Sequence, residues 1–329
     1  MANAAGVSIA TVSRVINGNY PVSEALRTRV QKAMDDLAYQ PNTLARGLRR
    51  QKTQSIGVLI PKLNDQFLGT LAYTIEKTLF DNGYRALLCS TEEALERETA
   101  YIDSLLQQQV DGVIMFPREH SRANVKRLLN ANVPVVLVER ELKNLPVHHV
   151  LVDNFEGGSL AARHLIELGH REIGLMTAVI DPYPIQNRLD GALAALREAG
   201  ISVPDERLMI VRSSEPRFQI GYRFGQAIAQ LTKRPTAIFA LTDELAVGAM
   251  HALTENGIRV PEDMSIIGFD NVPLASFVIP ALTTVEQPAS QIGKTAGTIL
   301  LRSLEGGSDE VEHISLSTTL IVRDSTAAR

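Results

Sequence analysis

The chain has 329 residues, of which 45% are hydrophobic and 21% are charged, a composition typical of a folded globular protein. Its apolar runs are shorter than the roughly 20 residues that span a bilayer, and its N-terminus lacks a signal-peptide pattern. The single cysteine, Cys89, excludes an internal disulfide. We therefore expect a cytoplasmic protein with no membrane partner and with Cys89 in its core.

Charge divides the sequence into a basic head and an acidic body. Residues 1–52 contain eight Lys and Arg residues and three acidic residues, a net charge of +5. Because the whole chain carries −4, residues 53–329 carry −9. This asymmetry suggests that one end of the chain binds a polyanion. A small helical cap with a solvated basic face would carry the same charge.

The first helix of ordinary length is predicted over residues 9–17. Ser8 is a suitable N-cap, and Val12, Val15 and Ile16 form one apolar face at helical spacing. The opposite face carries the small, hydroxyl, amide and guanidinium groups that reach phosphates and base edges in a major groove. These residues are Ile9, Ala10, Ser13, Arg14 and Asn17.

A second helix is predicted to start near Pro21 and Ser23. Its apolar stripe consists of Leu26, Val30, Met34 and Leu37. A short basic segment over residues 39–50 follows, and it ends with an apolar leucine among arginines.

Together these segments resemble the DNA-binding headpiece of the LacI/GalR family of bacterial transcription regulators. The resemblance lies in Gly-Val-Ser-Ile-Ala-Thr-Val-Ser-Arg-Val-Ile-Asn-Gly at 6–18 and in Tyr-Gln-Pro-Asn-Thr-Leu-Ala-Arg-Gly-Leu at 39–48. It implies a helix-turn-helix head over residues 1–40 and a hinge helix and linker over 41–53. The family's first helix begins several residues earlier, so this one looks truncated, and we expect the natural start to lie upstream.

The resemblance also implies how DNA is bound. Helix 9–17 would enter the major groove, where Ile9, Ala10 and Arg14 would read base edges. The hinge helix would enter the minor groove, and Leu48 would wedge into a central base step. The full set of residues implied to touch DNA is Ser8, Ile9, Ala10, Thr11, Ser13, Arg14, Asn17, Asn42, Ala45, Leu48 and Arg49. Two heads on a palindromic site require at least a homodimer.

Beyond residue 54 the sequence alternates between strands and helices. Strands are predicted at residues 55–60, 86–89, 112–116, 134–138, 150–152, 172–176, 208–211, 237–241, 265–269, 283–285, 313–317 and 319–322. Helices are predicted at residues 68–79, 93–108, 122–131, 156–168, 186–199, 222–231, 243–256 and 291–304. This alternation predicts an α/β fold of two doubly wound parallel sheets, each covered on both faces.

The family resemblance implies that these sheets form a two-lobed, periplasmic-binding-protein-like core over residues 54–329. One lobe would combine residues 54–152 with about 286–312, and the other 153–285 with about 313–329. A ligand cleft would lie between the lobes at the carboxyl ends of the strands.

Five residues near strand ends are candidates for binding an effector in that cleft: Phe67, Glu139, Arg188, Thr242 and Asp270. Phe67 can lie against an apolar ring face, Arg188 can donate two parallel hydrogen bonds, and Asp270 can accept two from vicinal hydroxyls. The resemblance implies that these three touch the effector. Each also has a structural alternative, which is core packing for Phe67, an ion pair for Arg188 and a helix cap for Asp270. Thr242 replaces an amide common in the family, and Glu139 offers a further acceptor.

The sequence therefore predicts a DNA-binding transcriptional repressor whose operator affinity is controlled by a small ligand, which we expect to be a sugar or sugar derivative. The expected partners are a pseudo-palindromic double-stranded DNA operator, the effector, and further copies of the chain in a homodimer or higher homo-oligomer. No catalytic motif, metal-ligand spacing or nucleotide fingerprint is present, so no cofactor is expected. Two alternatives use the same core, a solute-binding receptor and a sugar-converting enzyme.

Overall fold

The computed structural model describes residues 1–329 except 18–19, 38–52, 179–182, 214 and 308–309. The chain divides into two compact units, Met1–Gln54 and Ser55–Arg329. Among the described residues, no helix is both long and apolar enough to cross a membrane.

The described residues of the first unit include the helices α1 (Ala2–Ala5), α2 (Ile9–Asn17) and α3 (Glu24–Asp36). The N–H of Thr11 donates to the Ser8 hydroxyl at 3.1 Å, which confirms Ser8 as the cap of α2. Val12 and Val30 are buried in the small core between the helices, as the helical spacing predicts. Leu37 departs from the prediction because α3 ends at Asp36, and Leu37 lies beyond it with 53% of its surface exposed.

Helix α1 is a single turn without a side-chain cap at its start. Gly6 ends it in the left-handed conformation, with φ 58°. The guanidinium of Arg29 donates to the carbonyl oxygens of Ala5 at 2.8 Å and Gly6 at 2.9 Å. Arg29 therefore satisfies the last carbonyls of α1 and ties α1 to α3.

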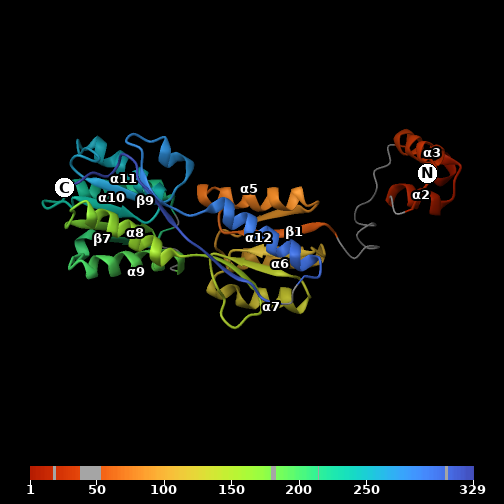
Figure 1. The fold of residues 1–329 in the computed structure, drawn as a ribbon, viewed down its shortest axis with the longest axis horizontal. Coiled ribbons are helices and arrows are strands. Elements are labelled where there is room, and N and C mark those ends of the chain that lie inside the picture. The colour runs from red at the N-terminus through yellow and green to blue at the C-terminus, as the bar shows by residue number, and fades with distance from the viewer. Residues whose placement is uncertain (18–19, 38–52, 179–182, 214, 308–309) are drawn as a thin grey trace. The chain divides into compact units, whose positions relative to one another are not determined.

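The second unit contains two six-stranded sheets, one in each lobe (Figure 1). The first sheet has the order β11-β5-β4-β3-β1-β2, and all of its pairings are parallel. Its strands are β1 (Ser55–Ile60), β2 (Arg85–Ser90), β3 (Gly112–Met115), β4 (Val135–Val138), β5 (His148–Val152) and β11 (His313–Leu316). Helices α5 (Gln66–Asp81) and α12 (Ala289–Leu304) pack on one face, and α6 (Leu95–Gln107) and α7 (Arg122–Asn130) on the other.

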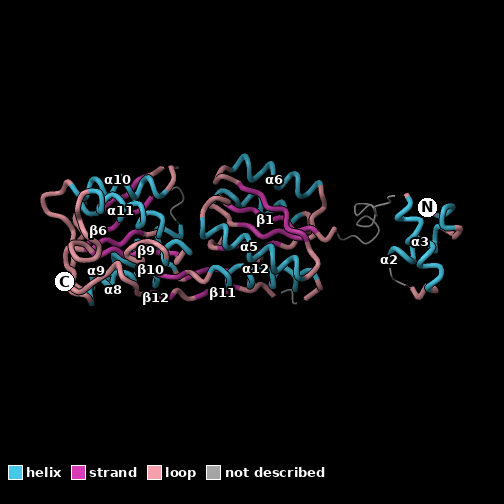
Figure 2. The backbone as a smooth tube through the Cα atoms, turned by 90° about the horizontal axis from the view of Figure 1, so that it is seen from above, coloured by secondary structure: helices cyan, strands magenta, loops and turns pink. Residues whose placement is uncertain are grey.

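The second sheet has the order β12-β10-β9-β8-β6-β7, in which only the β10–β12 pairing is antiparallel. Its strands are β6 (Ile173–Ala178), β7 (Leu208–Val211), β8 (Ala237–Ala240), β9 (Ser265–Asp270), β10 (Thr283–Glu286) and β12 (Thr319–Ile321). Helices α8 (Asn154–Glu167) and α9 (Tyr183–Glu198) cover one face, and α10 (Arg217–Ala229) and α11 (Asp243–Glu255) the other. Figure 2 shows both sheets enclosed between helical layers. Three short 3₁₀ turns, η1 (Glu119–Ser121), η2 (Asp205–Arg207) and η3 (Pro273–Ser276), complete the described elements.

Every predicted strand is present, but the expected division between the lobes is wrong at one place. Residues from about 313 onward were expected in the second lobe, whereas β11 pairs with β5 in the first sheet. Ile314 and Leu316 of β11 pack against the apolar core of the first lobe, which explains why the strand stays there. The chain therefore crosses between the lobes after β5, after β10, and finally between β11 and β12.

Helix α10 also departs from the prediction, since it begins at Arg217 and not near residue 222. Pro216 is the N-cap residue, and the residue before a proline disfavours the helical conformation, so α10 does not extend further upstream. The extra turn makes Arg217 the first residue of the helix.

Candidate effector site and DNA-binding face

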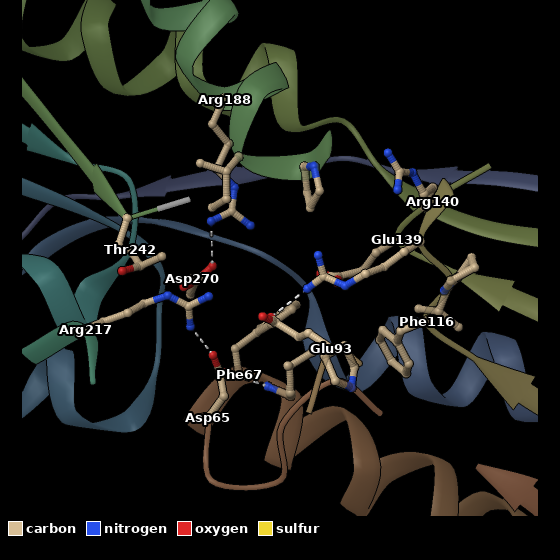
Figure 3. Close-up of a pocket in the computed structure, with 18 residues that line it drawn as sticks. Asp65, Phe67, Glu93, Phe116, Glu139, Arg140, Arg188, Arg217, Thr242 and Asp270 are labelled. Atoms are coloured by element: carbon tan, nitrogen blue, oxygen red, sulfur yellow. Dashed lines mark hydrogen bonds and ion pairs between the residues drawn. The ribbon is translucent and has the colours of Figure 1, made fainter. Parts of the chain in front are cut away.

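A pocket lies between the two lobes, at the carboxyl ends of strands from both sheets, with a cavity volume of about 100 Å³ (Figure 3). All five residues predicted for the effector site line it, namely Phe67, Glu139, Arg188, Thr242 and Asp270. The first lobe contributes the ends of β1, β3 and β4 with the first turn of α5. The second contributes α9, the start of α10 and the ends of β8 and β9. The structure thus brings these five residues together.

Arg188 lies within α9 and is almost completely buried. Its Nε donates to Asn154 at 2.7 Å and its Nη1 to the carbonyl of Leu241 at 2.9 Å. Nη1 also pairs with Asp270 at 3.2 Å, and the guanidinium lies 3.9 Å from the ring centroid of Phe269. The structural ion pair considered for Arg188 is therefore present, and the same side chain also faces the pocket.

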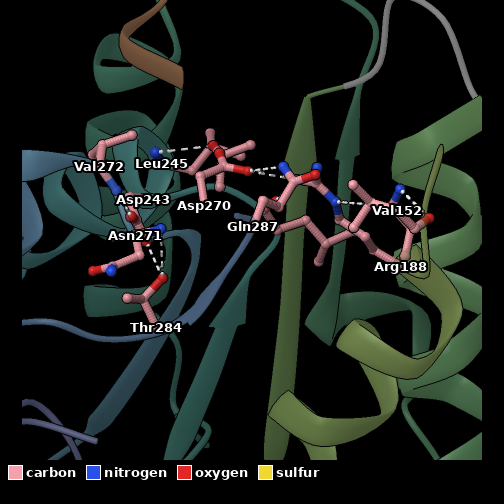
Figure 4. A network of polar contacts seen from close by, with 12 residues as sticks. Val152, Arg188, Asp243, Leu245, Asp270, Asn271, Val272, Thr284 and Gln287 are labelled. Carbon is pink, nitrogen blue, oxygen red and sulfur yellow. Dashed lines mark hydrogen bonds and ion pairs between the residues drawn. The ribbon is translucent and has the colours of Figure 1, made fainter. Parts of the chain in front are cut away.

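Asp270 ends β9 with a φ of 113°, in the region that non-glycine residues rarely adopt. Its Oδ1 accepts a hydrogen bond of 2.7 Å from the side chain of Gln287 (Figure 4). Gln287 follows β10, where the chain crosses back to the first lobe. Desolvation raises the pKa of Asp270 to about 6, although Arg188 opposes this shift. The helix-cap role considered for Asp270 is wrong, since Val272 occupies the N-cap of η3.

Glu139 follows β4 in the first lobe and also has a positive φ, of 68°. Burial of its carboxyl group raises its pKa to about 7. Among the described residues no hydrogen-bond partner is found for this carboxyl group. Strained backbone is costly and collects at functional sites, so one strained acidic residue in each lobe marks this pocket.

Phe67 and Thr242 have structural roles as well as lining the pocket. Phe67 is buried in the core of the first lobe, as its structural alternative proposed. The Thr242 hydroxyl accepts from the N–H of Leu245 at 3.4 Å and caps α11. The ring of Phe116, at the end of β3, adds a second aromatic wall.

Two further ion pairs were not predicted. Arg217 pairs with Asp65, and Arg118 pairs with Glu93 at 2.7 Å (Figure 3). The sequence signals that could have found the first pair are Pro216 before a helix and an aspartate at the N-cap of α5. The Glu93–Arg118 pair has no comparable local signal, because its partners come from different loops.

The proposed DNA-binding face of α2 is largely open to solvent. Ser8, Ile9, Ala10 and Arg14 are exposed, Ile9 by 80%, whereas Thr11 and Ser13 are half-buried. An isoleucine this exposed contributes little to the folding of the head. The side chain of Asn17, and the residues Asn42, Ala45, Leu48 and Arg49, lie outside the described part of the chain.

A helix-turn-helix head in one chain with a two-lobed α/β cleft defines a class of ligand-responsive DNA-binding proteins, and comparisons with known proteins identify the family. The bacterial regulatory proteins of the lacI family match residues 1–42, and the periplasmic binding protein-like domain matches residues 162–326. The transcriptional regulator DegA of Bacillus subtilis is 37% identical, with 99% of this chain and 97% of that protein covered. The transcriptional repressor PurR of Escherichia coli is also 37% identical, with 99% and 96% covered.

Solved structures agree with this assignment. The lac repressor dimer bound to operator and the anti-inducer ONPF has a TM-score of 0.87 and 28% identity, covering 99% of this chain and 98% of that one. A LacI family regulator from Enterococcus faecium with bound ribose has a TM-score of 0.75 and 31% identity, covering 84% and 99%. The chain therefore belongs to the lacI family of bacterial transcription regulators.

Proposed function

We propose that this protein is a transcriptional repressor that binds a pseudo-palindromic operator as a homodimer and responds to a sugar or sugar derivative held between its lobes. The observation that carries the proposal is the pocket itself, where acidic and guanidinium groups from both lobes converge beside aromatic rings. A ligand that touches both lobes can bias their relative orientation, and this is what control of a distant DNA-binding head requires.

The chemistry of the pocket supports a polyhydroxylated ligand. Glu139 and Asp270 offer carboxyl oxygens that accept hydrogen bonds from hydroxyls, and Arg188 offers donors. Phe67 and Phe116 provide flat apolar walls for the less polar face of a ring. The ribose named in the related Enterococcus structure belongs to this chemical class.

DNA recognition is assigned to the exposed face of α2. Ile9, Ala10 and Arg14 would meet base edges in the major groove, and a bidentate contact from Arg14 to guanine would be worth about 1–3 kcal/mol. Residues 41–53 would form a hinge that orders on DNA, with Leu48 as a minor-groove wedge. Gly47 suits such a hinge because glycine lowers intrinsic helix stability by about 1 kcal/mol.

An exposed apolar surface on the first lobe supports self-association. Tyr73 and Phe80, spaced two helical turns apart on α5, are 65% and 68% exposed. Leu88, on the edge strand β2, is 43% exposed. Apolar residues gathered in this way favour a protein interface. We propose that this surface forms part of the homodimer contact that presents two heads to the operator.

The test is a fluorescence anisotropy titration on DNA from around the protein's own gene and on random DNA, at two salt concentrations. Arg14→Ala should weaken binding to the operator by about 5- to 150-fold, because a base contact is lost. Binding to DNA of random sequence should weaken much less. The matched control, Arg27→Ala on α3, should weaken both DNAs alike. Equal loss on both DNAs for Arg14→Ala would remove base recognition from α2.

The ligand arm of the same experiment screens monosaccharides and disaccharides for a change in operator affinity. Arg188→Ala should abolish the response of any active sugar while the unliganded variant still binds operator. A normal response in that variant would show that the cleft is not the effector site. Turnover of a sugar by the purified protein would instead favour the enzyme alternative.

A further inference from the structure

Two charged residues meet across the cleft, one from each lobe. Asp65 is the N-cap of α5 in the first lobe, and Arg217 is the first residue of α10 in the second. Their side chains form an ion pair and are 11% and 27% exposed. The Asp65 carboxylate is fixed in place, because its other oxygen accepts the N–H of Leu68 at 3.0 Å. Figure 3 shows the two side chains reaching toward each other from separate elements.

A second contact joins the same two regions. The carboxyl group of Glu244, in the first turn of α11, lies in the wall of one recess with Asp65 and Arg217, close to the backbone N–H of Gln66. Adjacent residues at the start of α5 therefore contact the starts of two helices of the other lobe. An acid from the second lobe thus lies near the N-terminus of a first-lobe helix, where negative charge is favoured.

Arg217 lies at a position where a cation does not stabilise its own helix, α10. The N-terminus of a helix carries a partial positive charge, so a cation in the first residue is on the unfavourable end. Pairing with Asp65 offsets that penalty. The placement of Arg217 therefore favours an interaction between the lobes, with Glu244 of the second lobe as a further anion near it.

The pair also divides the cleft. The pocket of about 100 Å³ and a neighbouring recess of about 210 Å³ share Asp65 and Arg217 in their walls. An engineered cavity of about 150 Å³ holds a benzene ring. A sugar ring with its hydroxyls therefore needs more room than about 100 Å³, and parting Asp65 from Arg217 would join the pocket to the neighbouring recess.

We propose that Asp65, Arg217 and Glu244 form an interlobe latch that holds the cleft closed and must open for a ligand to enter. These are positioning residues, since they act through the orientation of the lobes. The statement about ligand entry rests on the proposed function of the cleft. The latch itself is a property of the two lobes and can be tested without a ligand or DNA.

The test is residue-resolved amide hydrogen exchange on the full-length protein, with the Gln66 N–H as the reporter. Arg217→Gln should accelerate its exchange about tenfold, because the lobes separate more often when the ion pair is absent. Asp65→Asn should have a similar effect, and asparagine still caps α5. The double variant should be no faster than the faster single variant, because both remove one interaction. Arg217→Lys should restore slow exchange.

The matched control is Arg223→Gln, on the same helix. Arg223 forms an ion pair with Glu215 within the second lobe at 2.6 Å, with both side chains about half exposed. Its loss should leave exchange at Gln66 unchanged. The buried amides of β3 and β4 serve as the reference for folding and should stay slow in every variant. Exchange at Gln66 that is unchanged in Arg217→Gln, or equally fast in Arg223→Gln, would overturn the latch, whereas the outcome of the operator titration would not be affected.

Discussion

Replacing Glu139 with glutamine should stabilise the second unit at and above neutral pH. The carboxyl group of Glu139 is desolvated in the pocket, and its pKa rises from 4.5 to about 7. A group whose pKa is raised by folding favours the folded state below its unfolded pKa. That contribution is lost as the pH rises through the folded pKa. The wild-type protein should therefore lose stability between about pH 4.5 and pH 7, whereas glutamine stays neutral throughout.

The magnitude follows from the pKa difference. At about 1.4 kcal/mol per pKa unit, a rise from 4.5 to about 7 corresponds to roughly 3 kcal/mol at pH 8 and to almost nothing at pH 4. This is an upper value, since the half-buried carboxyl group can turn toward water when it ionises. Groups outside the pocket titrate alike in both proteins, so their contributions cancel in the difference.

The assay is urea unfolding followed by circular dichroism at several pH values, because the chain contains no tryptophan. The midpoint of Glu139→Gln relative to wild type should rise as the pH increases from 4 to 8. Glu119→Gln is the control, because Glu119 is exposed in the same lobe and its replacement changes the net charge equally. It measures the change in stability that comes from net charge alone. Parallel stability profiles for Glu139→Gln and wild type would refute the reasoning, because they would mean that Glu139 ionises in the pocket without cost.

Two further substitutions test how the site is held together. Arg188→Met leaves the Asp270 carboxyl buried without its cation and should cost about 3–5 kcal/mol at pH 8. The loss should be smaller at pH 5, because Asp270 has a pKa of about 6 and can then take up a proton. Urea unfolding at both pH values measures the loss, and an equal loss at the two would contradict this explanation. Gly158→Ala would place a methyl group 1.9 Å from the carbonyl oxygen of Arg188. The variant should lose at least about 2 kcal/mol of stability or fail to fold, as measured by soluble yield and the urea midpoint. The control Gly69→Ala, with its nearest atom at 3.6 Å on an ordinary helix, should be neutral or stabilising by up to about 1 kcal/mol, and a similar loss at both positions would argue against close packing of α8 on α9.

Sequence patterns predicted the secondary structure well because most elements carry a strong local signal. Runs such as Ile56–Ile60 are too apolar to lie anywhere but inside a parallel sheet, and they form its buried strands. The helices of the core follow apolar stripes that the packing confirms. The placement of β11 failed for the opposite reason. The sequence of a four-residue edge strand does not indicate which sheet the strand joins. Its pairing with β5 places β11 in the first lobe.

Within the site, the sequence identified residues with distinctive chemistry but not the interactions among them. Phe67, Glu139, Arg188, Thr242 and Asp270 do line one pocket, although their role as effector ligands stays a prediction. The Asp65–Arg217 pair joins residues 152 positions apart. Pro216 and the N-cap aspartate indicate where the two helices begin, but not that their first residues meet. The positive φ values of Glu139 and Asp270 are likewise invisible in the sequence, since they depend on the loops that follow β4 and β9.

The stability lost at Glu139 and Asp270 indicates how the pocket can respond strongly to a small ligand. Each lobe holds one strained carboxyl group whose desolvation penalises the ionised form. Glu139 accepts no hydrogen bond among the described residues, whereas Gln287 and Arg188 already offset part of the penalty at Asp270. A ligand whose hydroxyls donate to both groups removes that penalty in both lobes at once, but only when the lobes are close enough for simultaneous contact. Its binding free energy therefore depends steeply on the lobe orientation, and this difference in affinity between orientations is what shifts a conformational equilibrium. Ligand donors favour the ionised carboxylates, so binding should also lower both pKa values, release protons near neutral pH and become tighter as the pH rises from 6 to 8.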